Sequence, residues 1–363
     1  MQNKFLSFFC LVFFTSFSAF ALDIIGDAPT LSGPSSASVN TELSKAFDEA
    51  LQGLRDSIGN IKSKPELFIK SWGDSSVFAS HGATQRAYGD YKTFFITIGP
   101  MIGLRLPGSP FTIVDDLSNL PDTLNTDQDI KLGLNPQALN INFGLNTSKF
   151  LLKNLYLGLH FGYMKLDNII EGFSFNTLSL GATANYQFFA PITLAKGLFV
   201  WRGVNVGSGF IYQGTNINYG LVLDSIVKKF DGPAGSKGTL SVNPVLTLDL
   251  KVSTFVIPIE ATTAVRLFWF LNIPLGVGFD LSFGQSDMHV GLDATIIPVL
   301  SGYTVEHSGS LSISAGGMMP PTVFNLKLMT GIGFNFGPVI IDIPITFYLD
   351  NGYSIGLSLG FKW

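Results

Sequence analysis

The sequence predicts an all-β protein: a transmembrane, antiparallel, up-and-down β-barrel of about fourteen strands with an N-terminal helix-containing segment. Two observations lead to this fold class. Long segments alternate between apolar residues and small or polar residues, with the period of two that a β-strand imposes. Charged residues make up only 13% of the 363 residues, whereas soluble domains carry about 25%.

Residues 1–21 have the organisation of a cleaved secretory signal peptide. Lys4 supplies a positive start, Phe5–Phe14 is the apolar core, and Ala19–Ala21 matches the A-x-A cleavage pattern. An uncleaved anchor helix is the alternative, but the apolar run is short. The only cysteine, Cys10, lies inside this run, so we expect the mature chain to have no disulfide and no thiolate metal site.

Residues 22–90 form an N-terminal segment of different character. Residues 25–40 are rich in Gly, Pro, Ser and Thr and are interpreted as a linker, and residues 41–58 are predicted to be an amphipathic helix. Its apolar residues recur at steps of three and four: Leu43, Phe47, Leu51, Leu54 and Ile58. This stripe needs a surface to cover it. The helix could plug the barrel lumen, pack on a partner in the periplasm, or belong to a disordered tail.

Residues 91–363 are predicted to form the barrel. In one example, Leu155, Leu157 and Leu159 alternate with Gly158 and His160. The segments are about 10 residues long, which suits a tilted membrane strand. A soluble sandwich or lipocalin-like barrel would also alternate, but its outward face should be rich in Lys and Glu. No second run of about 18 apolar residues follows the signal, so a membrane-embedded chain would need a closed barrel to pair its backbone groups.

We count thirteen strand segments in the alternating region. They are residues 91–105, 138–147, 154–165, 173–189, 197–213, 239–252, 255–267, 275–285, 288–298, 308–315, 322–336, 339–348 and 353–363. Bacterial single-chain barrels have even strand numbers, so residues 215–224 are predicted as a fourteenth strand, with twelve or sixteen left open. Two long connections, residues 107–135 and 225–236, are expected to be extracellular loops.

Charged residues within the strands are candidates for lining the lumen, because Arg or Lys at the lipid midplane costs about 2–4 kcal/mol. The candidates are Asp249, Lys251, Glu260, Arg266, Asp280 and Lys327. They could border a solute pathway or pair with one another to make the barrel rigid. Arg202 shares its face with apolar residues, which indicates a position near an interface or a β-bulge.

No enzyme activity, cofactor or metal site is predicted. The four histidines, His81, His160, His289 and His307, are scattered and form no H-x-x-x-H pair, and no G-x-S-x-G nucleophile motif accompanies them. Lumen-facing polar residues are the simpler interpretation of His160 and His289. The net charge of −4 and the lack of a Lys/Arg cluster argue against nucleic-acid binding.

The last strand alternates to the final residue, and Asn351-Gly352 before it suits a tight hairpin turn. Its residues on one face are Tyr353, Ile355, Leu357, Leu359, Phe361 and Trp363. This pattern resembles the C-terminal insertion signal of bacterial outer-membrane proteins. The resemblance implies location in the outer membrane, contact with its lipid, and recognition by the barrel-assembly machinery.

The layout as a whole, with a signal, about 70 residues and then the strands, is similar to that of the long-chain fatty-acid transporter barrels. In that family an N-terminal hatch plugs the lumen and hydrophobic substrates leave sideways through the wall. The resemblance implies that residues 22–90 are the plug, with apolar contacts from Phe68, Trp72, Val77 and Phe78. We therefore expect a channel or transporter for small or hydrophobic solutes such as fatty acids. The alternative is a structural or surface-adhesion barrel that acts through its loops.

Overall fold

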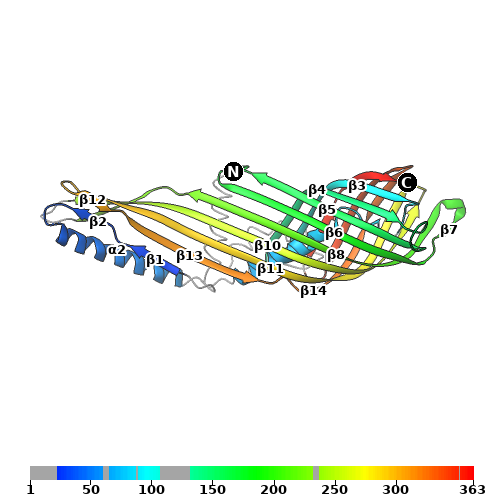
Figure 1. Ribbon diagram of the computed structural model, residues 1–363, viewed down its shortest axis with the longest axis horizontal. Helices are drawn as coiled ribbons and strands as arrows, with labels where there is room; N and C mark the ends of the chain where they lie inside the picture. The colour runs from blue at the N-terminus through cyan, green and yellow to red at the C-terminus, as the bar shows by residue number, and fades with distance from the viewer. Residues whose placement is uncertain (1–22, 60–64, 87–88, 107–130, 232–236, 351) are drawn as a thin grey trace.

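A computed structural model describes residues 23–59, 65–86, 89–106, 131–231, 237–350 and 352–363. The predicted antiparallel β-barrel is confirmed. Figure 1 shows tilted strands forming the barrel at one end of the molecule and a long β-extension, with a helix beside it, at the other end. The signal peptide predicted at residues 1–21 and most of the loop predicted at 107–135 lie outside the described residues.

The barrel closes because the last two strands both pair with the first strand of the ring. Described residues supply ten positions around the ring when β16 and β17 are counted as one. These are β3(Phe94–Arg105), β4(Gly133–Asn146), β5(Leu155–Asp167), β6(Phe173–Phe189), β8(Phe199–Val222), β10(Lys237–Leu267), β11(Leu271–Val299), β14(Phe324–Phe336), β15(Val339–Tyr348), and β16(Gly352–Gly356) with β17(Ser358–Lys362).

The sheet contains 15 strands, within the predicted range, but the ring is smaller than predicted because three strands are two to three times the expected length. The segments predicted at 197–213 and 215–224 are one strand, β8. Likewise the two segments predicted within residues 239–267 are β10, and the two within 275–298 are β11. Each of these three strands continues beyond the ring into the extension.

The hydrophobic pattern changes phase along each long strand while the strand itself continues. Even-numbered residues of β10 point inward throughout: Leu250 and Val252 are buried, and so are Thr254 and Thr262 further along. The outward residues change in the opposite sense, from the polar Asp249, Lys251 and Ser253 to the apolar Phe255, Ile257 and Ile259. Such a reversal indicates that water surrounds the first part of the strand and an apolar medium the second.

Within the ring, the outward face is apolar and the inward face is polar, as the alternation predicted. Large exposed side chains form an apolar girdle: Ile98, Leu159, Leu180, Phe210, Leu275, Phe324, Leu328, Ile343 and Leu359. Buried polar side chains face inward: Thr97, Asn135, Gln137, Asn140, His160, Thr177, Ser179, Gln213, Ser282, Asn325 and Thr346.

The extension is built on the outer halves of β10 and β11 and carries the predicted N-terminal helix. Strand β9(Ile226–Asp231) pairs with β10, β13(Gly309–Met319) pairs with β11, and β1(Asp23–Asp27) pairs with β13. Short strands β2(Thr30–Ser32) and β12(Thr304–His307) pair at its tip, and β7(Ile192–Leu194) flanks β8 at the other end of the molecule. Helix α2(Ser36–Gly59) lies along one face of the extension (Figure 1).

A second helix, α3(Pro65–Phe78), and the 3-10 turn η1(Ala79–His81) lie inside the ring. Proline suits the first helical turn, where its missing N–H costs no hydrogen bond. The helix has no apolar stripe, because wall strands surround it and Ser71, Asp74, Ser75 and Ser76 are as buried as Ile69. Among the described residues, no helix is long and apolar enough to cross a membrane.

Candidate functional site

The lumen is occupied by residues 65–86 and 89–93, which we call the plug. Helix α3 contacts strands on opposite sides of the ring, among them β3, β4, β10 and β11. Val77, Phe78 and Ala79 have no exposed surface. The functional question for this barrel is therefore how the plug is held.

Glycines in the wall allow the plug backbone to lie close to the strands. A Cβ added to Gly133 would collide with the carbonyl of Ser71, and one added to Gly103 would collide with the carbonyl of Ser75. A Cβ on Gly352 would strike the ring of Phe78. Glycine is the residue that permits such close backbone approach, so these three positions form a cradle for α3.

The first turn of the plug is held by apolar contacts. Phe68 and Ile69 belong to a buried cluster with the inward residues of the outer strand halves: Phe175, Ile217, Tyr219, Leu246, Leu248, Leu250, Val252, Met288, Val290 and Ala315. Trp72 packs against the same cluster. Phe78, at the end of the helix, stacks on Tyr348 with ring centroids 4.1 Å apart. The structure thus places Phe68, Trp72, Val77 and Phe78 in the lumen.

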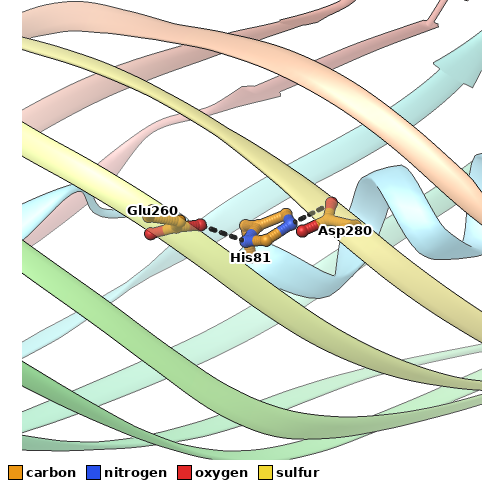
Figure 2. A group of neighbouring side chains, drawn as sticks. All are labelled: His81, Glu260 and Asp280. Carbon is orange, nitrogen blue, oxygen red and sulfur yellow. Dashed lines mark hydrogen bonds and ion pairs between the residues drawn. The ribbon is translucent and has the colours of Figure 1, made fainter.

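The middle of the plug meets a buried ionic cluster centred on His81 (Figure 2). Its Nε2 lies 2.7 Å from Asp280 Oδ2, and its Nδ1 lies 3.2 Å from Glu260 Oε1. Lys327 Nζ lies 2.5 Å from Glu260 and 2.7 Å from Asp280. Protonated His81 would give two cations against two carboxylates. Burial by itself lowers the pKa of His81, but the charge of Asp280 together with the hydrogen bonds to Asp280 and Glu260 outweighs this, and the pKa is raised.

The atoms of His81, Glu260 and Asp280 lie within 4.8 Å of one another, a donor set that could hold a metal ion. Lys327 argues against that use. Its ammonium group contacts both carboxylates at hydrogen-bond distance and already supplies the positive charge that a metal would bring. The cluster is best described as a plug-to-wall ion-pair network.

A second ionic cluster holds the end of the plug. Asp90 is buried and accepts hydrogen bonds from Lys362 at 2.6 Å, Arg86 at 3.0 Å and Asn335 at 3.0 Å, and it is also paired with Arg202. Burial alone would raise the pKa of Asp90, but the Arg202, Lys362 and Arg86 cations hold it below the usual range, so the carboxyl remains ionised.

Two more ionic contacts complete the attachment. Arg86 donates to both oxygens of Asp342 on β15, at 2.7 and 2.6 Å. Asp74 on α3 pairs with Arg105 on β3 at 2.8 Å and accepts a hydrogen bond from the backbone N–H of Thr322. Both arrangements are nearly inaccessible to solvent, where removing one partner of an ion pair is strongly destabilising.

Amide side chains on β4, which are hydrogen-bonded to Gln213 on β8, also contact the plug backbone. Gln137 donates to the carbonyl of Ala79 at 2.9 Å, and Asn140 accepts from the N–H of Ala83 at 2.9 Å. His160 belongs to the same inner surface, where it contacts Asn142 and Ser179, as expected of a lumen-facing polar residue. These bonds satisfy non-helical backbone that lies inside the barrel.

The lumen prediction is correct for three charges and wrong for two. Glu260, Asp280 and Lys327 point inward and meet one another, and Arg266 faces a cavity at the barrel mouth. Asp249 and Lys251 are exposed on the outer face of β10. Both residues lie in the part of β10 that belongs to the extension. In that part the polar face of the strand points outward into water, whereas within the ring the polar face points inward to the lumen.

The lumen placement of the amphipathic helix is also wrong. Leu43, Phe47 and Leu51 are buried, but Phe47 and Leu51 pack against Ile296 and Leu311 of the extension. The side chains of Leu54 and Ile58 lie outside the described residues. The stripe was correctly identified as needing a partner surface, and β1, β11 and β13 supply it.

The remaining candidates fall as follows. Four residues of the last strand point outward and are at least half exposed: Leu357, Leu359, Phe361 and Trp363. Ile355 is partly buried, and Tyr353 is buried beside Phe347. Arg202 lies at a β-bulge between β8 and β10, one of its two predicted positions. His289 and His307 are exposed near Asp287 and Asp27, so the lumen-facing interpretation is wrong for His289.

Sequence reasoning missed most of the plug's own charged residues: Asp74, Arg86 and Asp90, and their wall partners Arg105, Asp342 and Lys362. The alternation could have identified the wall residues, because each of them lies in an alternating segment at a position that shares the polar face of the strand. The plug residues gave no such signal, since residues 65–93 have neither helical nor strand periodicity.

The chain belongs to the Lsa36-like family, whose model matches residues 21–363. Among solved structures it is similar to the CymD monoaromatic hydrocarbon channel, with 10% identity over 80% of this chain and 98% of that chain and a TM-score of 0.25. It is also similar to the translocator domain of the autotransporter NalP from Neisseria meningitidis, with 10% identity, 88% and 98% coverage and a TM-score of 0.28.

A further similar structure is the toluene transporter TodX of Pseudomonas putida, with 9% identity, 81% and 98% coverage and a TM-score of 0.24. No curated protein matches the chain.

Proposed function

We propose that this chain is an outer-membrane barrel that passes small or hydrophobic solutes, and that the plug closes its lumen until its contacts with the wall are released. The observation that carries the proposal is the attachment of the plug by buried ion pairs around His81 and Asp90. An inert filling of a barrel would be better held by apolar packing, because buried ion pairs are weak contributors to net stability.

The outward apolar girdle supports a membrane location. Residues such as Phe210, Leu275 and Leu359 are about half exposed on the ring, which in water would leave a large apolar surface unburied. The short connections 268–270 and 337–338 lie at one end of the ring, and β10, β11 and β13 extend beyond the other end. Long connections in bacterial barrels are extracellular, which would place the extension outside the cell.

The finer proposal of a hydrophobic solute, such as a fatty acid, has support from a groove on the outward face. It has a volume of about 530 Å³ and an almost wholly apolar lining that includes Val204, Leu275, Val277, Leu328 and Phe347. Gly276 is also part of the lining. A hydrophobic molecule could occupy it from the lipid side.

Planar-bilayer conductance of a lockable plug tests the proposal. A Cβ built on Gly356 would lie 3.2 Å from Ala83 Cβ, a few tenths below the roughly 3.5 Å minimum of disulfides. The variant Ala83→Cys/Gly356→Cys/Asp90→Asn should therefore form a plug-to-wall disulfide. We expect no current when it is oxidised and stepwise current after reduction, with no such change for Asp90→Asn alone.

If the reduced, correctly folded variant passes neither ions nor a labelled fatty acid in liposomes, the channel proposal is wrong. The second candidate would then lead. The extension, formed by β10, β11 and β13 with α2 packed on one face, projects well beyond the ring and favours a surface-binding barrel (Figure 1). The last strand, ending at Phe361 and Trp363, is proposed to be read by the barrel-assembly machinery in either case.

A further inference from the structure

A cavity of about 650 Å³ opens at the end of the ring where β3 begins and β17 ends. The end of the plug borders it with Asp90 and Tyr91, and the wall contributes Arg202, Arg266 and Lys362. We call this cavity the basic vestibule. The end of the ring where β3 begins lies opposite the extension (Figure 1).

Positive charge dominates the basic vestibule. Its lining includes five cationic side chains, Lys92, Lys149, Arg202, Arg266 and Lys362, and one acidic side chain, Asp90. Cationic side chains therefore outnumber acidic side chains in this lining by five to one. A pocket in a chain with a net charge of −4 that gathers this many cations is unlike the rest of the molecule.

The internal ion pairs leave this charge unbalanced. Asp90 is shared by Arg86, Arg202 and Lys362. Arg266 has no carboxylate within ion-pair distance among the described residues, and the Nε atoms of Arg266 and Arg202 are buried without a hydrogen-bond partner. Arg266 pairs in register with Val200, so the two arginines lie on neighbouring strands at the same level.

Two arginines that face one cavity with unused donors are arranged as in oxyanion sites. The guanidinium group presents a planar fork of N–H donors that matches the oxygens of phosphate or carboxylate. We propose that the basic vestibule binds a phosphate group, held by Arg202 and Arg266 with Lys362 beside them. A phosphate carries more charge and more acceptor oxygens than one carboxylate, so a single phosphate can pair with several cations at once.

The phosphate could belong to a soluble ion or ester, or to the headgroup of an anionic lipid at the membrane surface. Both sources offer the same group to the arginines. The proposal goes beyond passage through the lumen and does not require the plug to move.

Isothermal titration calorimetry tests the proposal with the full mature chain in a nonionic detergent at fixed ionic strength. Inorganic phosphate is the probe in one arm, and vesicles of phosphatidylcholine with or without phosphatidylglycerol are the probe in the other. We expect saturable phosphate binding, one-to-one, that Arg266→Gln weakens by about tenfold to a hundredfold, since hydrogen bonds to charged groups contribute about 1.5–3 kcal/mol. Arg266→Lys keeps the charge but loses the planar fork of donors, so its phosphate affinity should lie between those of the unchanged protein and of Arg266→Gln.

Lys251→Gln is the matched control, because it removes a cation from the same strand on the exposed face of the extension. Arg266→Gln should fold normally, since no described carboxylate depends on it, and the heat-modifiable gel mobility of a folded barrel verifies this. Binding of free phosphate identifies a soluble ligand, and binding only to phosphatidylglycerol vesicles identifies a lipid. Binding in neither arm, equal binding of chloride, or equal loss in Lys251→Gln overturns the proposal.

Discussion

Replacing Asp90 by asparagine should release the end of the plug without unfolding the ring. Asp90 is the carboxylate that joins Arg86 of the plug to Arg202 and Lys362 of the wall, and its side chain is 1% exposed. Asparagine has nearly the same shape, so packing is preserved while the charge is lost. The strands of the ring stay paired through their backbone hydrogen bonds.

The magnitude follows from the burial of these groups. Removing one partner of a buried ion pair costs about 3–5 kcal/mol, because the remaining charges lose their compensation. The introduced amide would still accept one hydrogen bond, Arg202 and Lys362 face the basic vestibule, and Arg86 keeps its pair with Asp342, so we take the lower end, about 3 kcal/mol. Since 1.4 kcal/mol corresponds to a factor of ten, the population with the end of the plug released should rise about 100-fold.

A buried thiol reports that population. Ser80 has no exposed surface, and its Oγ makes no hydrogen bond, so Ser80→Cys should disturb the plug little. With a maleimide in excess and fast reclosing, the labelling rate is proportional to the released fraction. We expect Asp90→Asn in the Ser80→Cys background to label about 100 times faster than its parent, while tryptophan fluorescence of the folded barrel is unchanged.

Asp167→Asn is the control, because Asp167 forms an ion pair with Lys165 in which both side chains are about half exposed. Such surface pairs contribute little, so its labelling rate should match that of the parent. Equal labelling of Asp90→Asn and its parent would refute the reasoning that ionic contacts hold the plug. Simultaneous loss of barrel fluorescence would instead show that the plug and ring unfold as one unit.

Three other predictions concern pH, close packing and the girdle. Because the pKa of His81 is raised, its contribution to holding the plug is complete below the ordinary value of 6.5 and is lost as pH rises through the raised value. Open-channel current should therefore increase over that pH range. The variant His81→Asn should abolish this increase. Gly133→Ala should press on the Ser71 carbonyl, cost about 1–3 kcal/mol and accelerate Ser80→Cys labelling, whereas Gly220→Ala, with open space around its Cβ, should not. Phe210→Arg should lower the unfolding free energy in liposomes by about 2–4 kcal/mol, whereas Asn218→Arg, on the same face of β8 beyond the girdle, should change it by less than about 0.5 kcal/mol.

The sequence was sufficient for the class of fold because alternation is a local property. Leu159, Phe161 and Tyr163 face outward in the structure as their parity predicted, and the final residues Leu359 and Phe361 do the same. The number of ring strands was not accessible in this way. A reversal of phase at Ser253–Phe255 resembles the end of one strand and the start of another, although β10 runs through it without interruption.

The site was predictable only from the wall side. Glu260, Asp280 and Lys327 were identified because a charge in an apolar strand must point inward. Their partner His81 could not be found, because it lies 179 residues or more away along the chain, in a segment with no periodicity. Helix α3 has buried side chains all around it, and a helix of that kind lacks the amphipathic stripe on which its prediction depends.

The reversal of hydrophobic phase also determines which part of the plug can respond to solutes. On the side of the reversal toward the extension, Phe68 and Ile69 are held by an apolar cluster whose strength depends little on pH or salt. On the other side of the reversal, toward the basic vestibule, His81 and Asp90 are held by ion pairs. Deprotonation of His81, or an anion that competes with Asp90 for Arg202 and Lys362, can therefore loosen only the part of the plug that holds His81 and Asp90. The apolar part should remain seated while the end of the plug moves, so that the barrel opens from the mouth that carries the basic vestibule.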